Sequence, residues 1–426
     1  MPYHAPDEER LNPEDLSALQ RRKLSNMLRA VLPTNAFYRG KLAGLKSAAD
    51  APLSDLPFTT RAELQQDQIE HPPYGTNLTH PLDRYIRLHQ TSGSAGVPLR
   101  WLDTADDWTW WRKCWGMIYR AAGLTPADRL IFTFSFGPFI GFWSAFDSAL
   151  SLGNMCLAAG GMTTLARLRH LLDNDVTFVC CTPTYALRMA ETAAAEGIDL
   201  AGSKVRGLIV AGEPGGAIPA TRERIERAWG ARVFDHWGMT EVGPLAFECV
   251  ESPGELHVNE AESIAEVIHP QSGRPVPEGE PGELVMTNLG RWGAPVVRYR
   301  TGDQVVMRRA RCACGRWFAR LEGGIIGRID DMLIIRGNNV FPSAIEGILR
   351  SYADVVEFRT TVVTRAGMTD LKIEIEPRPD VDGAALASRI AQAIRDRLHF
   401  RPDVVAVPPG ALPRFEMKSR RLVRED

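Results

Sequence analysis

The chain has 426 residues, of which 44% are hydrophobic and 24% charged, with 50 basic side chains against 52 acidic ones. This length predicts two or three domains with a sizeable core, and the near-neutral charge gives no reason to expect nucleic acid or a membrane as a partner. The N-terminus lacks the apolar core of a signal peptide, and no apolar run is long enough to span a membrane. Seven cysteines, an odd count, argue against a disulfide framework and favour the cytoplasm.

Hydrophobic periodicity predicts an α/β fold. Residues 12–45 carry a helical pattern that begins with Asn12 as a cap and Pro13 just inside, and residues 56–64 hold a second capping signal. Buried strands are expected at 129–134, 176–181 and 205–210, and helices at 104–122, 184–196 and 219–229. This alternation predicts a mostly parallel sheet covered by helices.

The rest of the chain has a different pattern. Short strands, including 283–287 and 296–300, predict a β-rich subdomain over 255–320, with a strand exit at Arg300–Asp303. Beyond residue 331, strands at 355–364 and 370–376 and a helix at 382–398 predict a small α+β unit. The C-terminal part is therefore expected to fold separately.

A joint between these two parts is expected at residues 327–343. Gly327-Arg328-Ile329-Asp330-Asp331 is followed by a short apolar strand, 332–335, by turn residues at 337–339, and by Pro342, which opens a helix carrying Glu346. A charged linker flanked by glycine suits a hinge. An ordinary strand-turn-helix explains the same residues.

Three loops have the composition of ligand-binding segments. Residues 90–98 read Gln-Thr-Ser-Gly-Ser-Ala-Gly-Val-Pro, in which small residues and hydroxyls suit a polyphosphate but also suit a polar hairpin turn. Ala-Gly-Glu-Pro at 211–214 and Asp-His-Trp-Gly-Met-Thr-Glu at 235–241 follow expected strands, where α/β folds bind ligands. Taken alone, Glu241 could equally be a solvated loop acid.

Two further clusters contain residues that could line a binding pocket or hold a metal ion. Residues 132–143 are rich in Phe and end in Trp143; most of these rings are expected in the core. Cys312 and Cys314 are separated by one residue, and together with Cys249 and His257 they would make a Cys₃His set suited to structural zinc. Inert buried cysteines and a surface histidine are the alternative.

These motifs, in this order, resemble the AMP-forming acyl/aryl-CoA ligases of the adenylate-forming superfamily, and most closely the phenylacetate–CoA ligase branch. The resemblance covers nearly the whole chain, including a terminal Leu-Pro-Arg-x-x-x-Lys at 412–418. It departs from the family pattern at Ala95, where threonine is usual, at Leu99, where many members have lysine, and at Met417, where glycine is usual.

The resemblance implies a role for each motif. The cofactor-binding residues would be Thr91, Ser92, Gly93, Ser94 and Gly96 around the phosphates, Gly212, Glu213, Pro214, Asp235, His236, Trp237 and Gly238 around the adenine, Asp303 at the ribose, and Arg328. Thr240 would contact the α-phosphate, Glu241 would bind Mg²⁺, Lys418 would be the catalytic lysine, and Asp330 the hinge. The acid pocket would include Phe134, Phe136, Phe139, Ala211, Gly243 and Pro244. Some members of this branch also carry the Cys249, His257, Cys312 and Cys314 arrangement that binds structural Zn²⁺.

The implied architecture is a large N-terminal α/β domain, 1–326, containing the β-rich subdomain, a hinge at 327–331, and a mobile α+β domain at 332–426. The implied reaction uses ATP, Mg²⁺ and CoA to convert a small aromatic carboxylic acid to its adenylate and then to its CoA thioester. Two alternatives remain: transfer to a carrier protein or an amine, and a nucleotide-binding homologue without catalysis. A homodimer is compatible with the sequence but leaves no trace in it.

Overall fold

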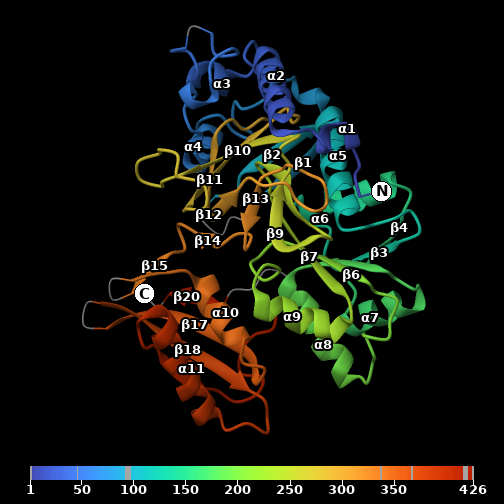
Figure 1. Ribbon diagram of the computed structural model, residues 1–426, viewed down its shortest axis with the longest axis vertical. Helices are drawn as coiled ribbons and strands as arrows, with labels where there is room; N and C mark the ends of the chain where they lie inside the picture. The colour runs from blue at the N-terminus through green and yellow to red at the C-terminus, as the bar shows by residue number, and fades with distance from the viewer. Residues whose placement is uncertain are drawn as a thin grey trace.

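The computed structural model describes residues 2–45, 47–91, 97–335, 338–365, 368–415 and 421–424 (Figure 1). Its N-terminal helices lie at one end of the molecule and are α1 (Pro6–Glu9), α2 (Pro13–Val31), α3 (Ala36–Lys41) and α4 (Arg61–Glu70). The Asn12 side chain accepts a hydrogen bond from the Asp15 amide, and Thr60 forms a capping box with Glu63. Both predicted caps are confirmed.

A parallel sheet forms the middle of the molecule, as the alternating pattern predicts. Its strands run in the order β4-β3-β5-β6-β7, with bounds Met155–Ala158, Arg129–Phe132, Phe178–Cys181, Gly207–Val210 and Arg232–Met239. The accompanying helices are α5 (Ala105–Ala121), α6 (Gly141–Ser151), α7 (Thr164–Asp173), α8 (Pro183–Ala195) and α9 (Pro219–Trp229). Strands β1 (Tyr85–Gln90) and β2 (Arg100–Thr104) pair separately.

The predicted β-rich segment continues this sheet and does not form a sheet of its own. The antiparallel strands β8 and β9 join β7, and the strand order β10-β11-β12-β13-β9-β8-β7 extends the structure to twelve strands. The added strands are β8 (Gly243–Cys249), β9 (Ser252–Val258), β10 (Ser263–Ile268), β11 (Pro281–Asn288), β12 (Tyr299–Arg308), β13 (Arg320–Glu322) and β14 (Gly327–Arg328). Residues from both halves therefore share one core.

Three local predictions need correction. The strand expected at 296–300 begins at Tyr299, because Arg298 has a φ of 46° and interrupts the extended backbone. The strand exit expected at Arg300–Asp303 is instead the first half of β12, where Gly302, at φ 74°, bends the strand. Residues 338–340, expected to include turn residues, form strand β16, which pairs antiparallel with β15.

The C-terminal part has its own hydrophobic core, in which residues between Leu333 and Phe400 pack together. Its four-stranded sheet has the order β19-β18-β17-β20, and its elements are β15 (Leu333–Ile335), β16 (Asn338–Val340), α10 (Pro342–Arg350), β17 (Val355–Arg365), β18 (Met368–Pro377), α11 (Gly383–Leu398), β19 (Asp403–Ala406) and β20 (Leu422–Arg424). Proline occupies the first turn of α10, as predicted.

This C-terminal part lies below β12 and β14 in the view of Figure 1 and beside α8 and α9, with α10 next to α9. Arg421 donates to the Thr184 hydroxyl at the start of α8 at 3.0 Å and pairs with Glu357 at 2.6 Å. The Arg224 side chain of α9 donates to the Val355 carbonyl. Among the described residues, no helix is both long and apolar enough to cross a membrane.

Candidate active site

Four residues of the predicted nucleotide site lie in one continuous polar chain. The indole Nε1 of Trp237 donates to Asp303 Oδ2 at 2.9 Å. Strand pairing places Arg328 directly opposite Asp303, and their side chains approach to 3.4 Å. Arg328 also pairs with Asp330, through Nε at 2.9 Å and through its terminal amine at 3.0 Å. The predicted adenine, ribose and hinge residues are therefore linked by direct side-chain contacts.

The residues on either side of this chain have different environments. Burial, reinforced by the nearby Glu248 carboxylate, raises the pKa of Asp235 to about 7. His236 packs on Trp115 with ring centroids 4.5 Å apart, and its Nδ1 lies 2.9 Å from the Ala246 carbonyl. Burial lowers the pKa of His236 to about 4. A neutral, packed imidazole is expected to support β7.

The predicted adenine loop leaves β6 beside the start of α8. Glu213 accepts a hydrogen bond from the Thr184 amide at 2.9 Å, so its carboxylate lies at the positive end of that helix. The side-chain hydroxyl of Thr184 accepts a hydrogen bond from Arg421 of the C-terminal part. This loop therefore lies where the two parts of the chain meet.

Glu241 lies in a buried position at the other end of the motif. Its side chain is 2% exposed and forms an ion pair with Arg61 at 2.9 Å, and Tyr299 donates to it at 3.3 Å. A second Arg61 amine donates to the Thr91 hydroxyl at 3.0 Å. A buried carboxylate is a suitable oxygen ligand for Mg²⁺, and the structure excludes the alternative of a solvated loop acid.

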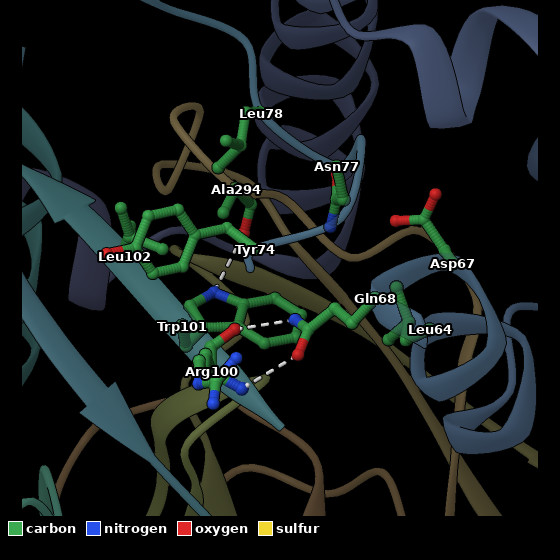
Figure 2. Close-up of a pocket in the computed structure, with 10 residues that line it drawn as sticks. All are labelled: Leu64, Asp67, Gln68, Tyr74, Asn77, Leu78, Arg100, Trp101, Leu102 and Ala294. Carbon is green, nitrogen blue, oxygen red and sulfur yellow. Dashed lines mark hydrogen bonds between the residues drawn. The ribbon is translucent and has the colours of Figure 1, made fainter. Parts of the chain in front are cut away.

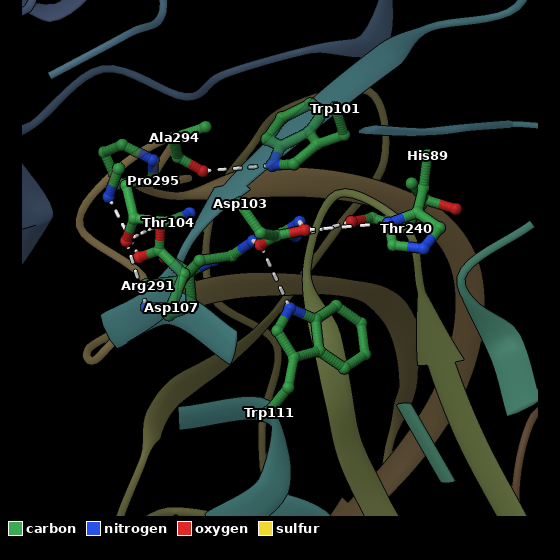
Figure 3. A network of polar contacts seen from close by, with 12 residues as sticks. His89, Trp101, Asp103, Thr104, Asp107, Trp111, Thr240, Arg291, Ala294 and Pro295 are labelled. Atoms are coloured by element: carbon green, nitrogen blue, oxygen red, sulfur yellow. Dashed lines mark hydrogen bonds and ion pairs between the residues drawn. The ribbon is translucent and has the colours of Figure 1, made fainter. Parts of the chain in front are cut away.

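The backbone of this motif is held by a buried ion pair (Figure 3). Arg291 and Asp103 are both inaccessible to solvent and interact through two contacts, at 2.7 and 2.8 Å. Arg291 also donates to the carbonyl oxygens of Thr240, at 2.5 Å, and Glu241, at 3.3 Å. Because a buried guanidinium needs all of these acceptors, the pair fixes the path of the Thr240–Glu241 backbone.

The aromatic segment after β3 forms a compact cluster. Phe136 has its ring centroid 4.7 Å from Trp143 and 5.3 Å from Phe134. Phe134 and Phe136 pack against the same core as Trp237, whereas Phe139 is 40% exposed. Gly243 allows the Trp110 ring to approach the backbone closely, since a Cβ there would clash with it.

The predicted metal residues converge from three segments. Cys249, His257, Cys312 and Cys314 are all buried, and their ligand atoms lie within 4.8 Å of one another. Cys249 Sγ is 3.8 Å from Cys312 Sγ, and Cys314 Sγ is 3.6 Å from His257 Nε2. Tetrahedral zinc, with bonds of about 2.3 Å to sulfur and about 2.0–2.1 Å to nitrogen, requires edges of roughly 3.8 and 3.5 Å. The cluster fits that geometry.

A small pocket lies away from these residues, between α4 and β2 (Figure 2). Two of its polar side chains already have partners, since Gln68 bonds to the Arg100 backbone and Trp101 Nε1 donates to Ala294. None of the residues of the predicted site lines it.

The sequence of the chain matches two family models. Residues 41–290 match the AMP-binding enzyme model, and residues 337–425 match the AMP-binding enzyme C-terminal domain. The chain is 32% identical to a phenylacetate–coenzyme A ligase of Thermus thermophilus, with 97% of each chain aligned. It is 30% identical to the corresponding Escherichia coli enzyme, with 96% of this chain and 94% of that one aligned.

The chain belongs to the AMP-binding enzymes of the phenylacetate–coenzyme A ligase-like branch. Among solved structures, 2-hydroxyisobutyryl-CoA ligase in the postadenylation state has a TM-score of 0.94, at 27% identity, and covers 100% of this chain and 93% of that one. The same ligase in the thioesterification state has a TM-score of 0.76. The arrangement of the two parts of this AMP-binding enzyme is therefore that of the postadenylation structure.

Some predicted residues of this AMP-binding enzyme lie outside the described part of the chain. They are Ser92, Gly93, Ser94, Ala95, Gly96, Met417 and Lys418. Their neighbours are described. Thr91 is nearly buried and bonds to Arg61, and Arg421 lies between the two parts.

Sequence reasoning missed four residues that support the site of this AMP-binding enzyme. They are Arg61, Asp103, Arg291 and Tyr299. Only Asp103, within a strand otherwise composed largely of buried residues, carried a visible signal, because an acid at a buried strand position requires a partner. The other three matter through contacts with residues that lie 50 or more positions away along the chain.

Proposed function

We propose that the acid activated by this AMP-binding enzyme is a small aryl carboxylic acid, such as a benzoic or phenylacetic acid. The enzyme is an acid–thiol ligase that converts its acid to an acyl-adenylate and then to a CoA thioester. The observation that carries the reaction class is the preformed chain of Trp237, Asp303, Arg328 and Asp330 beside buried Glu241. Phenylacetate ligases among the relatives and the Phe134–Trp143 cluster support an aromatic acid.

In the first half-reaction, the residues mainly position and neutralise charged groups. Trp237 offers its ring to the adenine, and Asp303, oriented by the Trp237 indole, accepts hydrogen bonds from the ribose hydroxyls. Thr240 is held by Arg291 next to the position of the α-phosphate. A carboxylate oxygen of the acid attacks the α-phosphorus, the bond to the β-phosphate oxygen breaks, and pyrophosphate leaves.

Glu241 is the residue that would hold Mg²⁺, which neutralises phosphate charge when bound. The donor fits, since its only described side-chain partners are Arg61 and Tyr299. In the second half-reaction, the CoA thiolate attacks the carbonyl carbon of the adenylate and AMP departs. Residues 1–326 and 332–426 are proposed to be domains hinged at 327–331, so that the C-terminal domain can serve each half-reaction in turn.

The substrate class can be tested by measuring kcat/KM over a panel of acids. Benzoate and phenylacetate derivatives are expected to exceed acetate, hexanoate and 2-hydroxyisobutyrate by about tenfold or more, because an apolar wall gains contact area with each ring. Pyrophosphate release without CoA, and thioester only with CoA, would identify the acceptor. Preference for an aliphatic or hydroxy acid would refute the aryl assignment, and adenylate that never transfers to CoA would favour a carrier protein or an amine.

We further propose that Cys249, His257, Cys312 and Cys314 bind one structural zinc ion. Four protein ligands leave no open position, so the ion would not take part in catalysis. It would join β8 and β9 to the loop at 312–314. All seven cysteines lie in the described part and are free thiols, which suits the reducing cytoplasm proposed for this enzyme.

Protein purified without chelator is expected to contain about one zinc per chain. Cys312→Ser should lose the metal and unfold at a lower temperature, since metal binding stabilises only the folded state. Cys156→Ser is the matched control, because Cys156 lies on β4 outside the cluster. Metal analysis and thermal unfolding measure both effects. Zinc-free wild-type protein of full stability would disprove the site.

A further inference from the structure

Position 99 carries no cation in this chain. Leu99 stands where many family members have lysine, and its side chain is completely buried, so nothing at this position can neutralise a phosphate. A triphosphate that loses pyrophosphate needs positive charge near its β- and γ-phosphates. The described residues around Thr91 and Glu241 include a candidate for this role.

That candidate is Arg61, at the first position of α4. Its side chain is 27% exposed, and its two terminal amines are divided between Glu241 and Thr91, at 2.9 and 3.0 Å. Its Nε is buried and makes no hydrogen bond within the described part of the chain. Arg61 therefore joins the predicted metal ligand to the residue that precedes the predicted phosphate loop, and it has donor capacity to spare.

The contact with Glu241 compensates a buried charge. A carboxylate that is 2% exposed needs an opposite charge, and here Arg61 provides it. Once a metal ion compensates Glu241, that amine of Arg61 is released. The other amine remains fixed by Thr91, whose hydroxyl also accepts from the Leu99 amide at 3.0 Å. The guanidinium would then be held next to Thr91, with the released amine available to a phosphate.

We propose that Arg61 binds the β- and γ-phosphates of ATP and the departing pyrophosphate, replacing the lysine that this chain lacks at position 99. The inference rests on the proposed function and extends it. Guanidinium groups suit this task because their planar donors match two phosphate oxygens at once and their charge is permanent. Arg61 exchanges Glu241 for phosphate when the metal–nucleotide complex enters.

The test measures the binding of magnesium pyrophosphate and magnesium ATP to the complete, unmodified enzyme and to three variants. Calorimetry with magnesium pyrophosphate and with magnesium ATP would compare wild type, Arg61→Met, Arg61→Lys and Arg84→Met. The control Arg84 is exposed and lies on the short turn Leu82–Arg84, so it removes the same charge elsewhere. Arg61→Met is expected to weaken pyrophosphate binding by about 10- to 100-fold, as for loss of hydrogen bonds to a charged group. Arg61→Lys should recover part of this loss, and Arg84→Met should bind as wild type.

A kinetic readout separates phosphate binding from general damage. Thioester formation from supplied acyl-adenylate involves no pyrophosphate and should be unchanged in Arg61→Met, whereas adenylate formation should slow. If Arg61→Met does not fold, Arg61→Gln provides the same comparison with a side chain that can still donate to Glu241. Wild-type pyrophosphate affinity in an uncharged variant would overturn the proposal and leave Arg61 as the counter-charge of Glu241. Because pyrophosphate binding needs no acid, this result is independent of whether the aryl substrate is correct.

Discussion

Replacing Lys418 by alanine is expected to slow acyl-adenylate formation by about 10²–10³-fold and to leave thioester formation from supplied adenylate nearly intact. A fixed ammonium beside the attacking carboxylate and the α-phosphate stabilises the charge that develops there. In the proposed hinge motion the second half-reaction uses the other orientation of the C-terminal domain, in which the lysine is expected to have no such role. Single-turnover assays of each half-reaction measure the two effects separately.

The described residues on both sides of Lys418 lie against the N-terminal part. Phe415 and Arg421 line a pocket shared with Thr184 and Leu187 of α8, so the chain meets the N-terminal part just before and just after the lysine. Arg378→Ala is a suitable control, since Arg378 also lies in the C-terminal part but far from the 415–421 segment in sequence. Equal losses in both half-reactions of the Lys418 variant would contradict the proposed division of labour.

Asp330→Pro is expected to abolish most steady-state turnover while preserving one of the two half-reactions. Proline fixes φ near −65°, so the linker would be restricted to one family of backbone conformations. The related ligase differs between its two catalytic states enough to change the TM-score with this chain from 0.94 to 0.76. A chain that cannot rotate at the hinge would complete one step and stop.

Asp330→Ala is the matched control for this experiment. It removes the ion pair with Arg328, at 2.9 Å, but keeps a freely rotating backbone, so it should retain both half-reactions and most of the turnover. Half-reaction assays on the two variants distinguish loss of the ion pair from loss of rotation. Normal turnover by Asp330→Pro would show that residues 327–331 are not the hinge.

The local elements of this protein are readable from its sequence because they depend on neighbouring residues. Asn12 and Thr60 cap helices through amides three positions away. The apolar runs at 178–181 and 207–210 predict buried strands, and the structure buries them. The order of short motifs was also sufficient to recognise the family. The strand predicted at 296–300 was wrong before Tyr299 because Arg298 has a positive φ, which cannot be predicted from the residue type.

The site contacts depended on tertiary structure. Arg61 reaches Glu241 across 180 positions of sequence, and Arg291 reaches Asp103 across 188. A single charged residue gives no signal of its distant partner, whereas hydrophobic periodicity repeats within one element. The sequence by itself determined the caps, the strand–helix alternation and the family. Only the tertiary structure, by bringing α4, β2 and the loops after β7 and β11 together, decided which charges meet, because burial makes each charge require a partner that the topology must supply.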